Sequence, residues 1–365
     1  MTLGSICDGI GGWQLAAVRA GIKPVWSSEI DKHCMSITAQ HFPNTIQLGD
    51  VTNPKWQASY VDIITAGTPC QSLSVAGKRE GLKGESGLFF SAIKLVRRIN
   101  PKFFVWENVP GAFSSNAGND FRTVLEEILQ ERVPLPRYWS NAGLVDGRRC
   151  QVAWRLLDAQ YWGVPQRRKR IFLVADFAGR RAREILFEPA SVPRDTAAGE
   201  VEERNFGTAT RTNVDYTVYE HHWKDARVKN VGDKAPTVSA MYGTGGLNTP
   251  LVSYGLKLNS TCDNGRELQP TLRTAPFACV GYGLRQNATS DYGRELQPAL
   301  SAKPRDMVAA GVVRRLTPLE CERLQGLPDD WTAGISDTQR YKAIGNGMAQ
   351  PIADWILRRI KDVVA

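Results

Sequence analysis

Two side chains able to take part in covalent catalysis each follow an apolar run that predicts a buried strand. Cys70 lies in the sequence GTPCQS at positions 67–72, directly after the run Val61–Ala66, and Glu107 follows the run Phe103–Trp106. A thiolate is a strong nucleophile, and a nearby carboxyl group can hold or transfer a proton. The polar, glycine-rich surroundings of Cys70 favour a reactive thiol over a packed one. Glu107 taken alone fits a surface carboxylate equally well.

A glycine-rich turn and two further acids indicate a nucleoside cofactor. The turn follows the apolar run Leu3–Ile6 and consists of Asp8, Gly9, Ile10, Gly11 and Gly12. Glycines let a backbone approach a cofactor closely, and the helix that starts here turns its N–H groups outward. Position 14 is Gln rather than the third glycine of the dinucleotide motif, so a tight turn without a ligand stays an alternative. Glu29 and Asp50 then follow where acids contact a nucleoside, and the three features together favour that ligand.

The net charge of +9 is concentrated in one stretch of the chain. Residues 131–185 hold twelve Lys or Arg against five Asp or Glu, which is +7. Four consecutive cations, at positions 167–170, precede the apolar run Ile171–Ala175. A solvated charge run is the usual explanation, but arginines at the start of a buried strand could bind a phosphate or a carbonyl oxygen.

The cysteines and histidines predict neither disulfides nor a metal. The seven cysteines are scattered without a C-x-x-C pair, and the four histidines lack the spacing of metal ligands. The N-terminus has no basic region followed by an apolar run, and no stretch approaches 18 apolar residues. We therefore expect a cytoplasmic protein with reduced thiols, no metal and no membrane contact.

The first half of the chain alternates strand-like and helix-like segments, which predicts an α/β fold with a doubly wound, mostly parallel sheet. The expected strands are Leu3–Ile6, Pro24–Ser28, Val61–Ala66, Phe103–Trp106, Val152–Leu157 and Ile171–Ala175. The expected helices are Trp13–Ala20, Asp31–His41, Leu88–Ile99, Asp120–Leu129, Pro318–Gln325 and Pro351–Val363.

Beyond about residue 185 the chain becomes rich in Thr, Asn and Gly, which predicts a second, smaller, irregular and β-rich domain. It contains an internal repeat, residues 254–274 and 282–302, with an offset of 28. Residues 235–240 form a degenerate third copy of its end. The repeated segments could be recognition units or only turns and strand starts that shape the domain.

The order of these motifs resembles that of the C5 cytosine-specific DNA methyltransferase family. Besides the glycine-rich turn, the resemblance includes Pro69-Cys70-Gln71, Glu107-Asn108-Val109, Gln166-x-Arg168-x-Arg170, Arg315-Leu316-Thr317-Pro318 and Gly345-Asn346-Gly347, and it covers about residues 1–177 and 311–365. One departure is Cys7-Asp8, where many members have Phe-Ala.

The resemblance implies transfer of a methyl group to C5 of a flipped-out cytosine in a specific duplex DNA sequence. Cys70 would add to C6, and Glu107 would hold N3 and the exocyclic amine. Arg168 would orient the base or acidify Cys70, and Arg170 would tie the rim of the pocket together. The cofactor implied is S-adenosylmethionine, which would be bound by Asp8, Gly9, Ile10, Gly11, Gly12, Glu29, Ile30, Asp50, Val51, Pro69 and Asn346.

The resemblance also implies domain boundaries and partners. Residues 1–185 with 338–365 would form the catalytic and cofactor-binding domain, and residues 186–337 the DNA target-recognition domain. The enzyme would be of a prokaryotic or phage type and monomeric on DNA, and a cognate restriction endonuclease is a candidate partner.

Three other functions stay open from the sequence. A nicotinamide-dependent dehydrogenase shares the glycine-rich turn and Glu29 but gives no reason for the motifs at Cys70 and Glu107. A non-catalytic DNA-binding descendant would be expected to have lost one of those two residues first, and both are present. An RNA cytosine C5 methyltransferase could use the same active site, although the long repeat-containing region fits a DNA-reading module better.

Overall fold

The computed structural model describes most of the chain. The described residues are 1–53, 57–69, 87–188, 216–221, 228–232, 234–244, 250–254, 279–280 and 312–364. Cys70 lies outside them, and so do the two repeat units apart from Tyr254.

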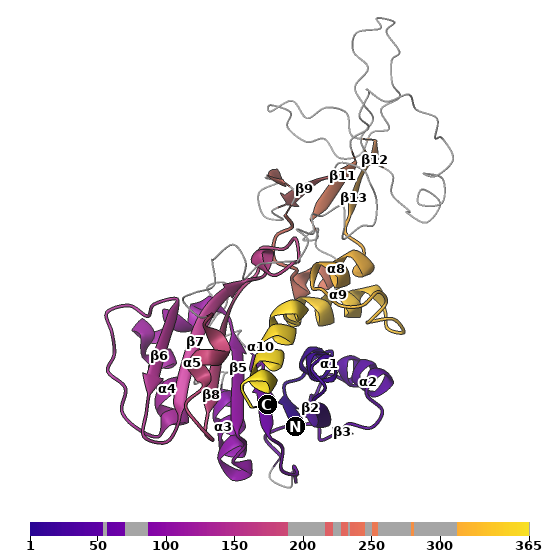
Figure 1. The fold of residues 1–365 in the computed structure, drawn as a ribbon. Coiled ribbons are helices and arrows are strands. Elements are labelled where there is room, and N and C mark those ends of the chain that lie inside the picture. The colour runs from indigo at the N-terminus through magenta and orange to yellow at the C-terminus, as the bar shows by residue number, and fades with distance from the viewer. Residues whose placement is uncertain are drawn as a thin grey trace, which may run out of the picture.

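A mixed eight-stranded sheet forms the centre of the molecule (Figure 1), in the order β3-β2-β1-β4-β5-β8-β7-β6. Strands β3 to β5 are parallel, whereas β8, β7 and β6 are antiparallel to their neighbours. The bounds are β1 Thr2–Ile6, β2 Lys23–Ser28, β3 Ile46–Gln47, β4 Ile63–Ala66, β5 Phe103–Asn108, β6 Ala142–Asp146, β7 Gln151–Asp158 and β8 Lys169–Asp176. The predicted doubly wound, mostly parallel sheet is confirmed.

The strand order decides where a ligand can bind. Strands β4 and β5 are apolar and buried on both faces, as the uninterrupted apolar runs predict. The order reverses between β1 and β4, and ligands of such sheets bind beyond the carboxyl ends of the strands at this point. The glycine-rich turn follows β1, and residues 67–69 follow β4.

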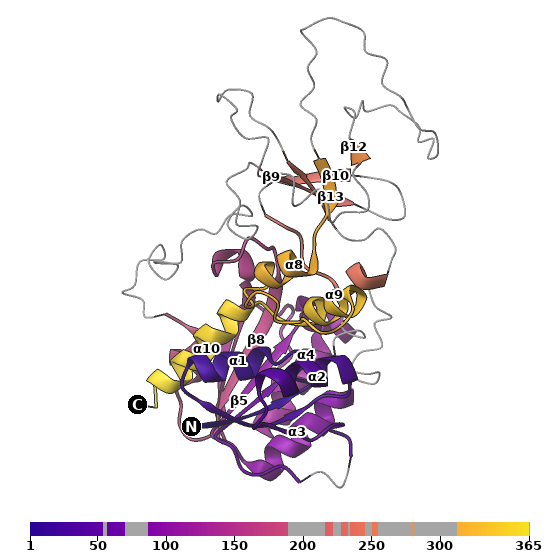
Figure 2. The same cartoon turned by 90° about the vertical axis from the view of Figure 1, so that its right-hand side faces the viewer.

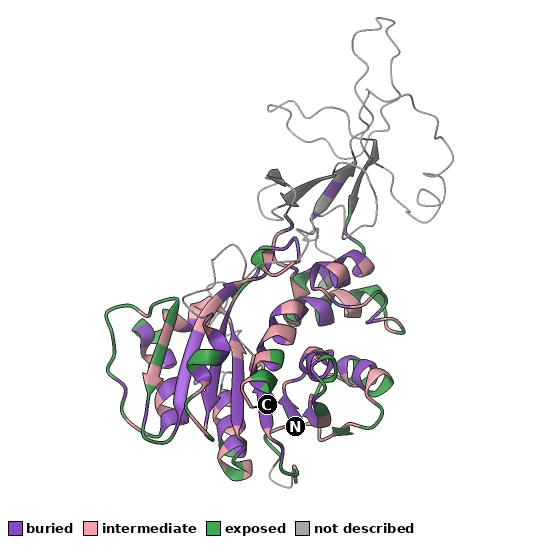
Figure 3. Cartoon of the chain, in the orientation of Figure 1, coloured by how far each residue is buried: buried purple, intermediate pink, exposed green. Residues whose placement is uncertain are grey.

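Helices cover both faces of the sheet and bury two apolar layers between them (Figure 3). One face carries α3 (Leu88–Ile99) and α4 (Asn119–Leu129), and the other carries α1 (Gly12–Arg19), α5 (Ala182–Leu186) and α10 (Gln350–Asp362). In α10 the buried Ile352, Ile356 and Ile360 recur every four residues, so one apolar stripe faces the sheet. Helices α1 and α10 lie side by side (Figure 2) although they open and close the chain.

The segment before α9 belongs to this body and not to the second region. Helix α9 (Asp337–Asn346) contacts both α2 (Lys32–His41) and α8 (Pro318–Leu324), the helix before it in the chain. Trp331 donates from Nε1 to the Ile10 carbonyl oxygen at 2.9 Å, and its ring stacks on that of His41 with centroids 3.7 Å apart. These contacts attach the segment between α8 and α9 to the glycine-rich turn and to α2.

A second, five-stranded antiparallel sheet lies beyond the carboxyl ends of the parallel strands (Figure 1). Its order is β10-β9-β11-β13-β12, with bounds β9 Tyr216–His221, β10 Val228–Gly232, β11 Leu251–Tyr254, β12 Cys279–Val280 and β13 Val312–Arg315. The two repeat units fall between β11 and β12 and between β12 and β13. Four short 3-10 helices complete the described elements: η3 Pro110–Phe113, η4 Ser115–Gly118, η5 Ala159–Tyr161 and η6 Ala240–Thr244.

Candidate active site

Glu107 and Arg170 form a mostly buried ion pair at the switch-point edge of the main sheet. They come from the neighbouring antiparallel strands β5 and β8, and Glu107 Oε1 lies 3.1 Å from Arg170 Nε. Their side chains are 16% and 17% exposed. Burial raises the pKa of the Glu107 carboxyl above its usual value, and the positive charges of Arg170 and Arg168 oppose this rise. A buried carboxyl group beside two cations is a candidate for proton transfer.

The chain that leads to position 70 passes directly beside this pair. A Cβ placed on Gly67 would lie 3.8 Å from Glu107 Oε2. The next residue, Thr68, accepts a hydrogen bond at 2.9 Å on its hydroxyl from Trp106 Nε1, and Asn108 Nδ2 donates to its carbonyl oxygen at 3.4 Å. Strand β5 therefore supplies Glu107 and also fixes the start of the segment that carries Pro69 and Cys70.

The sequence reasoning did not assign a role to Thr68 or Trp106. A buried indole N–H needs an acceptor, and a tryptophan at the end of an apolar strand takes one from the adjoining strand end. This requirement was the signal that could have identified the contact.

None of the cysteines whose side chains the structure describes suits a nucleophile. Burial raises the pKa of the Cys7 and Cys150 thiols to about 12, and it raises those of Cys34 and Cys321 as well. Thiols of this kind stay protonated and inert at neutral pH.

The glycine-rich turn and Glu29 meet at the ends of β1 and β2. Gly9 and Gly11 have φ values of 57° and 81°, in the left-handed region that favours glycine. The Gly9 N–H donates to Glu29 Oε2 at 2.8 Å, while Glu29 Oε1 accepts from the N–H groups of Ile30 and Asp31 at 2.8 and 2.9 Å. Three backbone N–H groups thus orient the Glu29 carboxylate. Because Glu29 is only half-buried, a polar group of a ligand can still reach it.

Asp50 and Ile30 continue this edge outward. The Ser28 hydroxyl donates to the Gly49 carbonyl oxygen, which ties the residue before Asp50 to the end of β2. Asp50 is exposed, and its Oδ1 accepts from the N–H and hydroxyl groups of Thr52, each at 2.8 Å. Ile30 is apolar yet 69% exposed, which leaves a hydrophobic surface next to two carboxylates. Val51 is half-buried against the apolar layer under α3 and α4.

The side chain of Asp8 points away from this edge into the protein. It is 6% exposed, and its Oδ2 accepts a hydrogen bond from Gln14 Nε2. Burial raises the pKa of its carboxyl group to about 6, despite the Gln14 hydrogen bond, which favours the charged form. Its backbone carbonyl oxygen accepts from the Gly11 N–H, so Asp8 shapes the turn through its main chain.

The residues that follow α9 pack against the same turn, directly after Asn346. Asn346 is exposed at the last position of α9. A Cβ on Gly12 would lie 3.3 Å from Met348 Cε, and Gln350 Nε2 donates to the Gly12 carbonyl oxygen at 3.0 Å. Arg168, by contrast, is 2% exposed and donates to three backbone carbonyl oxygens.

Most of the predicted residues therefore fall in one line, which we call the carboxyl-edge row. The strand order β3-β2-β1-β4-β5 places its members side by side. They are Asp50, Glu29, residues 9–12, residues 67–69 and Glu107. The row therefore carries carboxylates at both of its ends and the glycine-rich backbone between them.

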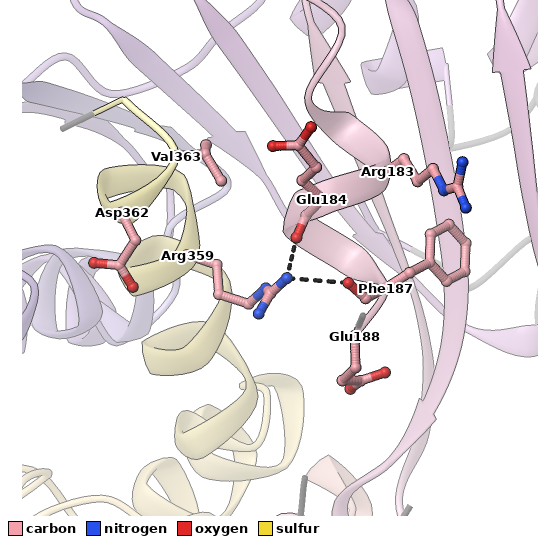
Figure 4. Close-up of a pocket in the computed structure, with 7 residues that line it drawn as sticks. All are labelled: Arg183, Glu184, Phe187, Glu188, Arg359, Asp362 and Val363. Carbon is pink, nitrogen blue, oxygen red and sulfur yellow. Dashed lines mark hydrogen bonds between the residues drawn. The ribbon is translucent and has the colours of Figure 1, made fainter. Parts of the chain in front are cut away.

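A hollow of roughly 430 Å³ lies elsewhere, between α5 and α10 (Figure 4). None of the predicted site residues lines it. Its Arg359 donates to the carbonyl oxygens of Glu184, Ile185 and Phe187 at the end of α5, so this guanidinium caps a helix. Within the described residues, no group of three or more His, Cys, Asp or Glu could hold a metal ion, and no helix is long and apolar enough to cross a membrane.

Comparison with known proteins adds a family and a fold. The family described as C-5 cytosine-specific DNA methylase matches residues 1–362. A DNA N-6-adenine-methyltransferase of Escherichia phage P1 is 29% identical over 99% of this chain, which spans only 61% of that relative's length. The type II methyltransferase M.HpaII of Haemophilus parainfluenzae is 27% identical over 94% of this chain and 84% of its own. The solved structure of S. pombe Dnmt2 methyltransferase has a TM-score of 0.56 at 14% identity and covers 100% of this chain and 99% of its own.

Proposed function

Because the chain belongs to the C-5 cytosine-specific DNA methylase family, we propose that it methylates C5 of a cytosine within a specific double-stranded DNA sequence. The observation that carries the proposal is the Glu107–Arg170 pair beside residues 67–69, which lead directly to Cys70. The name of the phage P1 relative specifies adenine, but that name describes a longer protein of which this chain covers 61%.

We propose that the β3 to β1 part of the row, its cofactor end, binds S-adenosylmethionine. Glu29 would accept hydrogen bonds from the ribose hydroxyls, and Asp50 would accept one from the edge of the adenine. The exposed side chain of Ile30 would pack on the adenine ring. The turn at residues 9–12, Val51, Pro69 and Asn346 would complete the site, and Asp8 would contribute through its backbone. When bound, S-adenosylmethionine supplies an electrophilic methyl group.

The β4 to β5 part of the row, together with Arg170 on the adjoining β8, forms its substrate end and would activate the base. Cytosine C5 is too weak a nucleophile to react unaided, so the Cys70 thiolate forms a bond to C6 and makes C5 electron-rich. Glu107, whose burial favours its protonated form, holds N3 while charge develops on the ring. After methylation, loss of the C5 proton and of the thiolate restores the aromatic ring. Arg170 keeps Glu107 oriented at 3.1 Å throughout.

The base has to leave the DNA stack to reach these groups. The target carbon is inaccessible within a duplex. The enzyme would therefore flip the nucleotide out of the stack and toward the carboxyl ends of β4 and β5. Arg167 and Lys169 are exposed next to the buried Arg168 and would contact DNA phosphates there. The type II designation of M.HpaII supports a role in restriction–modification.

Trapping on DNA that contains 5-fluorocytosine tests the proposal. Fluorine at C5 blocks the proton loss that frees the enzyme, so a covalent complex should form only with S-adenosylmethionine, and peptide mapping should place the DNA on Cys70. Cys70→Ser should form no complex, whereas Cys7→Ser, at a thiol whose pKa is about 12, should still form it. DNA attached to another cysteine, or no complex although ordinary DNA is methylated, contradicts the mechanism.

An RNA substrate is the second candidate because it would meet the same catalytic groups. The five-stranded second sheet and the repeats between its strands favour a reader of duplex DNA. Trapping on an RNA hairpin that contains 5-fluorocytosine distinguishes the two substrates. A covalent complex that forms preferentially with RNA would make RNA the proposed substrate.

A further inference from the structure

Arg168 is a buried cation that joins three segments far apart in the sequence. It precedes β8 and is 2% exposed. Its Nη1 donates to the Val238 carbonyl oxygen at 2.9 Å, and its Nη2 donates to the carbonyl oxygens of Gly345, at 3.1 Å, and of Gly347. One guanidinium therefore holds together the start of β8, the segment before η6 and the end of α9.

The contacts with Gly345 and Gly347 cap a helix. The last carbonyl groups of a helix lack intrahelical partners and carry partial negative charge, so a cation there satisfies both needs. Asn346, the residue between these two glycines, is the exposed last residue of α9, and a Cβ on the adjoining Gly347 would lie 3.7 Å from Ile10 Cδ1 in the glycine-rich turn. The position of its amide thus depends on two carbonyl groups that Arg168 binds.

The segment that contains Val238 is clamped from both sides. Gln166 Oε1 accepts from the Val238 N–H at 2.7 Å, while Arg168 binds the carbonyl oxygen of the same residue. A Cβ on Gly345 would lie 2.1 Å from the Ala240 nitrogen, so this segment and the end of α9 touch backbone to backbone. A shift at one of the three segments therefore has to move the others.

We infer that Arg168 is a positioning residue that sets the cofactor contact of Asn346, rather than a group that touches the cytosine. This inference rests on the proposed function and assigns a role different from the expected orientation of the base. Arg170, which pairs with Glu107 from β8, suits that contact with the substrate instead. Arg168 thereby ties the geometry of the cofactor end to β8 and to the segment before η6.

A double-mutant cycle on cofactor affinity tests the inference. Calorimetry with S-adenosylhomocysteine would compare the wild type with Arg168→Ala, Asn346→Ala and the double variant. Each single change should weaken binding by about tenfold, and the double variant should bind no more than a few-fold worse than either, because both remove the same contact. At saturating S-adenosylmethionine, kcat of Arg168→Ala should stay within roughly fivefold of the wild type.

Arg359→Ala is the matched control. Arg359 also donates to three carbonyl oxygens at the end of a helix, but next to the hollow between α5 and α10 and away from the row (Figure 4). It should leave the affinity for S-adenosylhomocysteine unchanged. If Arg168→Ala does not fold, Arg168→Lys, which keeps the charge but not the fork of donors, should show a smaller loss of the same kind.

Two outcomes would overturn the inference. A large fall in kcat with unchanged S-adenosylhomocysteine affinity would place Arg168 on the substrate, and fully additive losses in the cycle would separate it from Asn346. Failure of the wild type to bind S-adenosylhomocysteine would contradict the proposed function instead.

Discussion

The two ends of the carboxyl-edge row hold their charges in opposite ways. At the cofactor end, Glu29 is oriented by three backbone N–H groups and stays half-buried, and Asp50 is exposed. At the substrate end, Glu107 and Arg170 form an ion pair between the neighbouring strands β5 and β8, and both side chains are mostly buried. The first arrangement joins residues no more than 20 positions apart, whereas the second joins positions 63 residues apart.

This difference follows from what each end has to do. A carboxylate that only accepts hydrogen bonds from a ligand should stay charged, and backbone donors stabilise the charged form. A group that handles a proton needs a pKa shifted toward neutrality, which burial provides at Glu107. Changes at the substrate end should therefore act on turnover, and changes at the cofactor end on affinity.

Glu107→Gln should produce the largest effect. The amide can still form hydrogen bonds but cannot exchange the proton at N3, so turnover should fall by at least about a thousandfold while DNA affinity stays within a few-fold. Single-turnover methylation and a DNA-binding titration measure the two. Glu184→Gln, at an exposed position of α5, is the control. Near-normal turnover in Glu107→Gln would remove the proposed distinction between the ends.

Asp8 tests whether a buried carboxylate beneath the cofactor end lowers the free energy of unfolding. Its pKa of about 6 in the folded protein exceeds the ordinary value of 3.8, so folding favours the protonated form. The stability this brings is present below pH 3.8 and is lost as the pH rises through 6, a difference of up to about 3 kcal/mol. Asp8→Asn should therefore be the more stable protein at pH 7.5.

Urea unfolding at several pH values measures this difference. The gap between Asp8→Asn and the wild type should shrink as the pH falls from 7.5 toward 4.5, because the wild-type carboxyl group becomes neutral. A constant gap would mean that folding does not shift the pKa of Asp8, and a less stable variant at pH 7.5 would mean that the ionised carboxylate stabilises the protein.

The fold could be predicted where the apolar residues recur with a strong period. It could not be predicted where an element depends on contacts with distant parts of the chain. The six predicted strands and four N-terminal helices are confirmed to within about two residues. Strand β6 was missed because exposed residues alternate along it, and α9 because it is mostly polar and depends on packing against α8 and η6. In the site, the local contacts of Glu29 could be anticipated. The partners of Arg168 could not, because they lie about 70 to 180 residues away.

Sequence choice should depend on neither end of the row. The repeat units each carry an arginine, Arg266 and Arg294, that lies outside the described residues, and each suits a bidentate contact with a guanine. If the units read DNA, Arg266→Ala or Arg294→Ala should lose roughly 1 to 3 kcal/mol of discrimination at one base while S-adenosylhomocysteine affinity is unchanged. Bisulfite profiles that are uniformly lower, with the same preferred sequence, would mean that these arginines bind phosphate or support the fold.

Asp50→Ala should have the smallest effect and yet separates the cofactors most clearly. Asp50 is exposed and offers one carboxylate to an adenine edge, so its loss should weaken S-adenosylhomocysteine binding by about tenfold and leave kcat at saturating cofactor nearly unchanged. Asp362→Ala, exposed near the end of α10, should change neither quantity. Because Glu29 and the turn would also fit the ribose of a dinucleotide, the same titration with NAD completes the test. Binding of NAD but not of S-adenosylhomocysteine would assign the cofactor end to a dehydrogenase, and a fall in kcat alone would show that Asp50 acts with Glu107 rather than with Glu29.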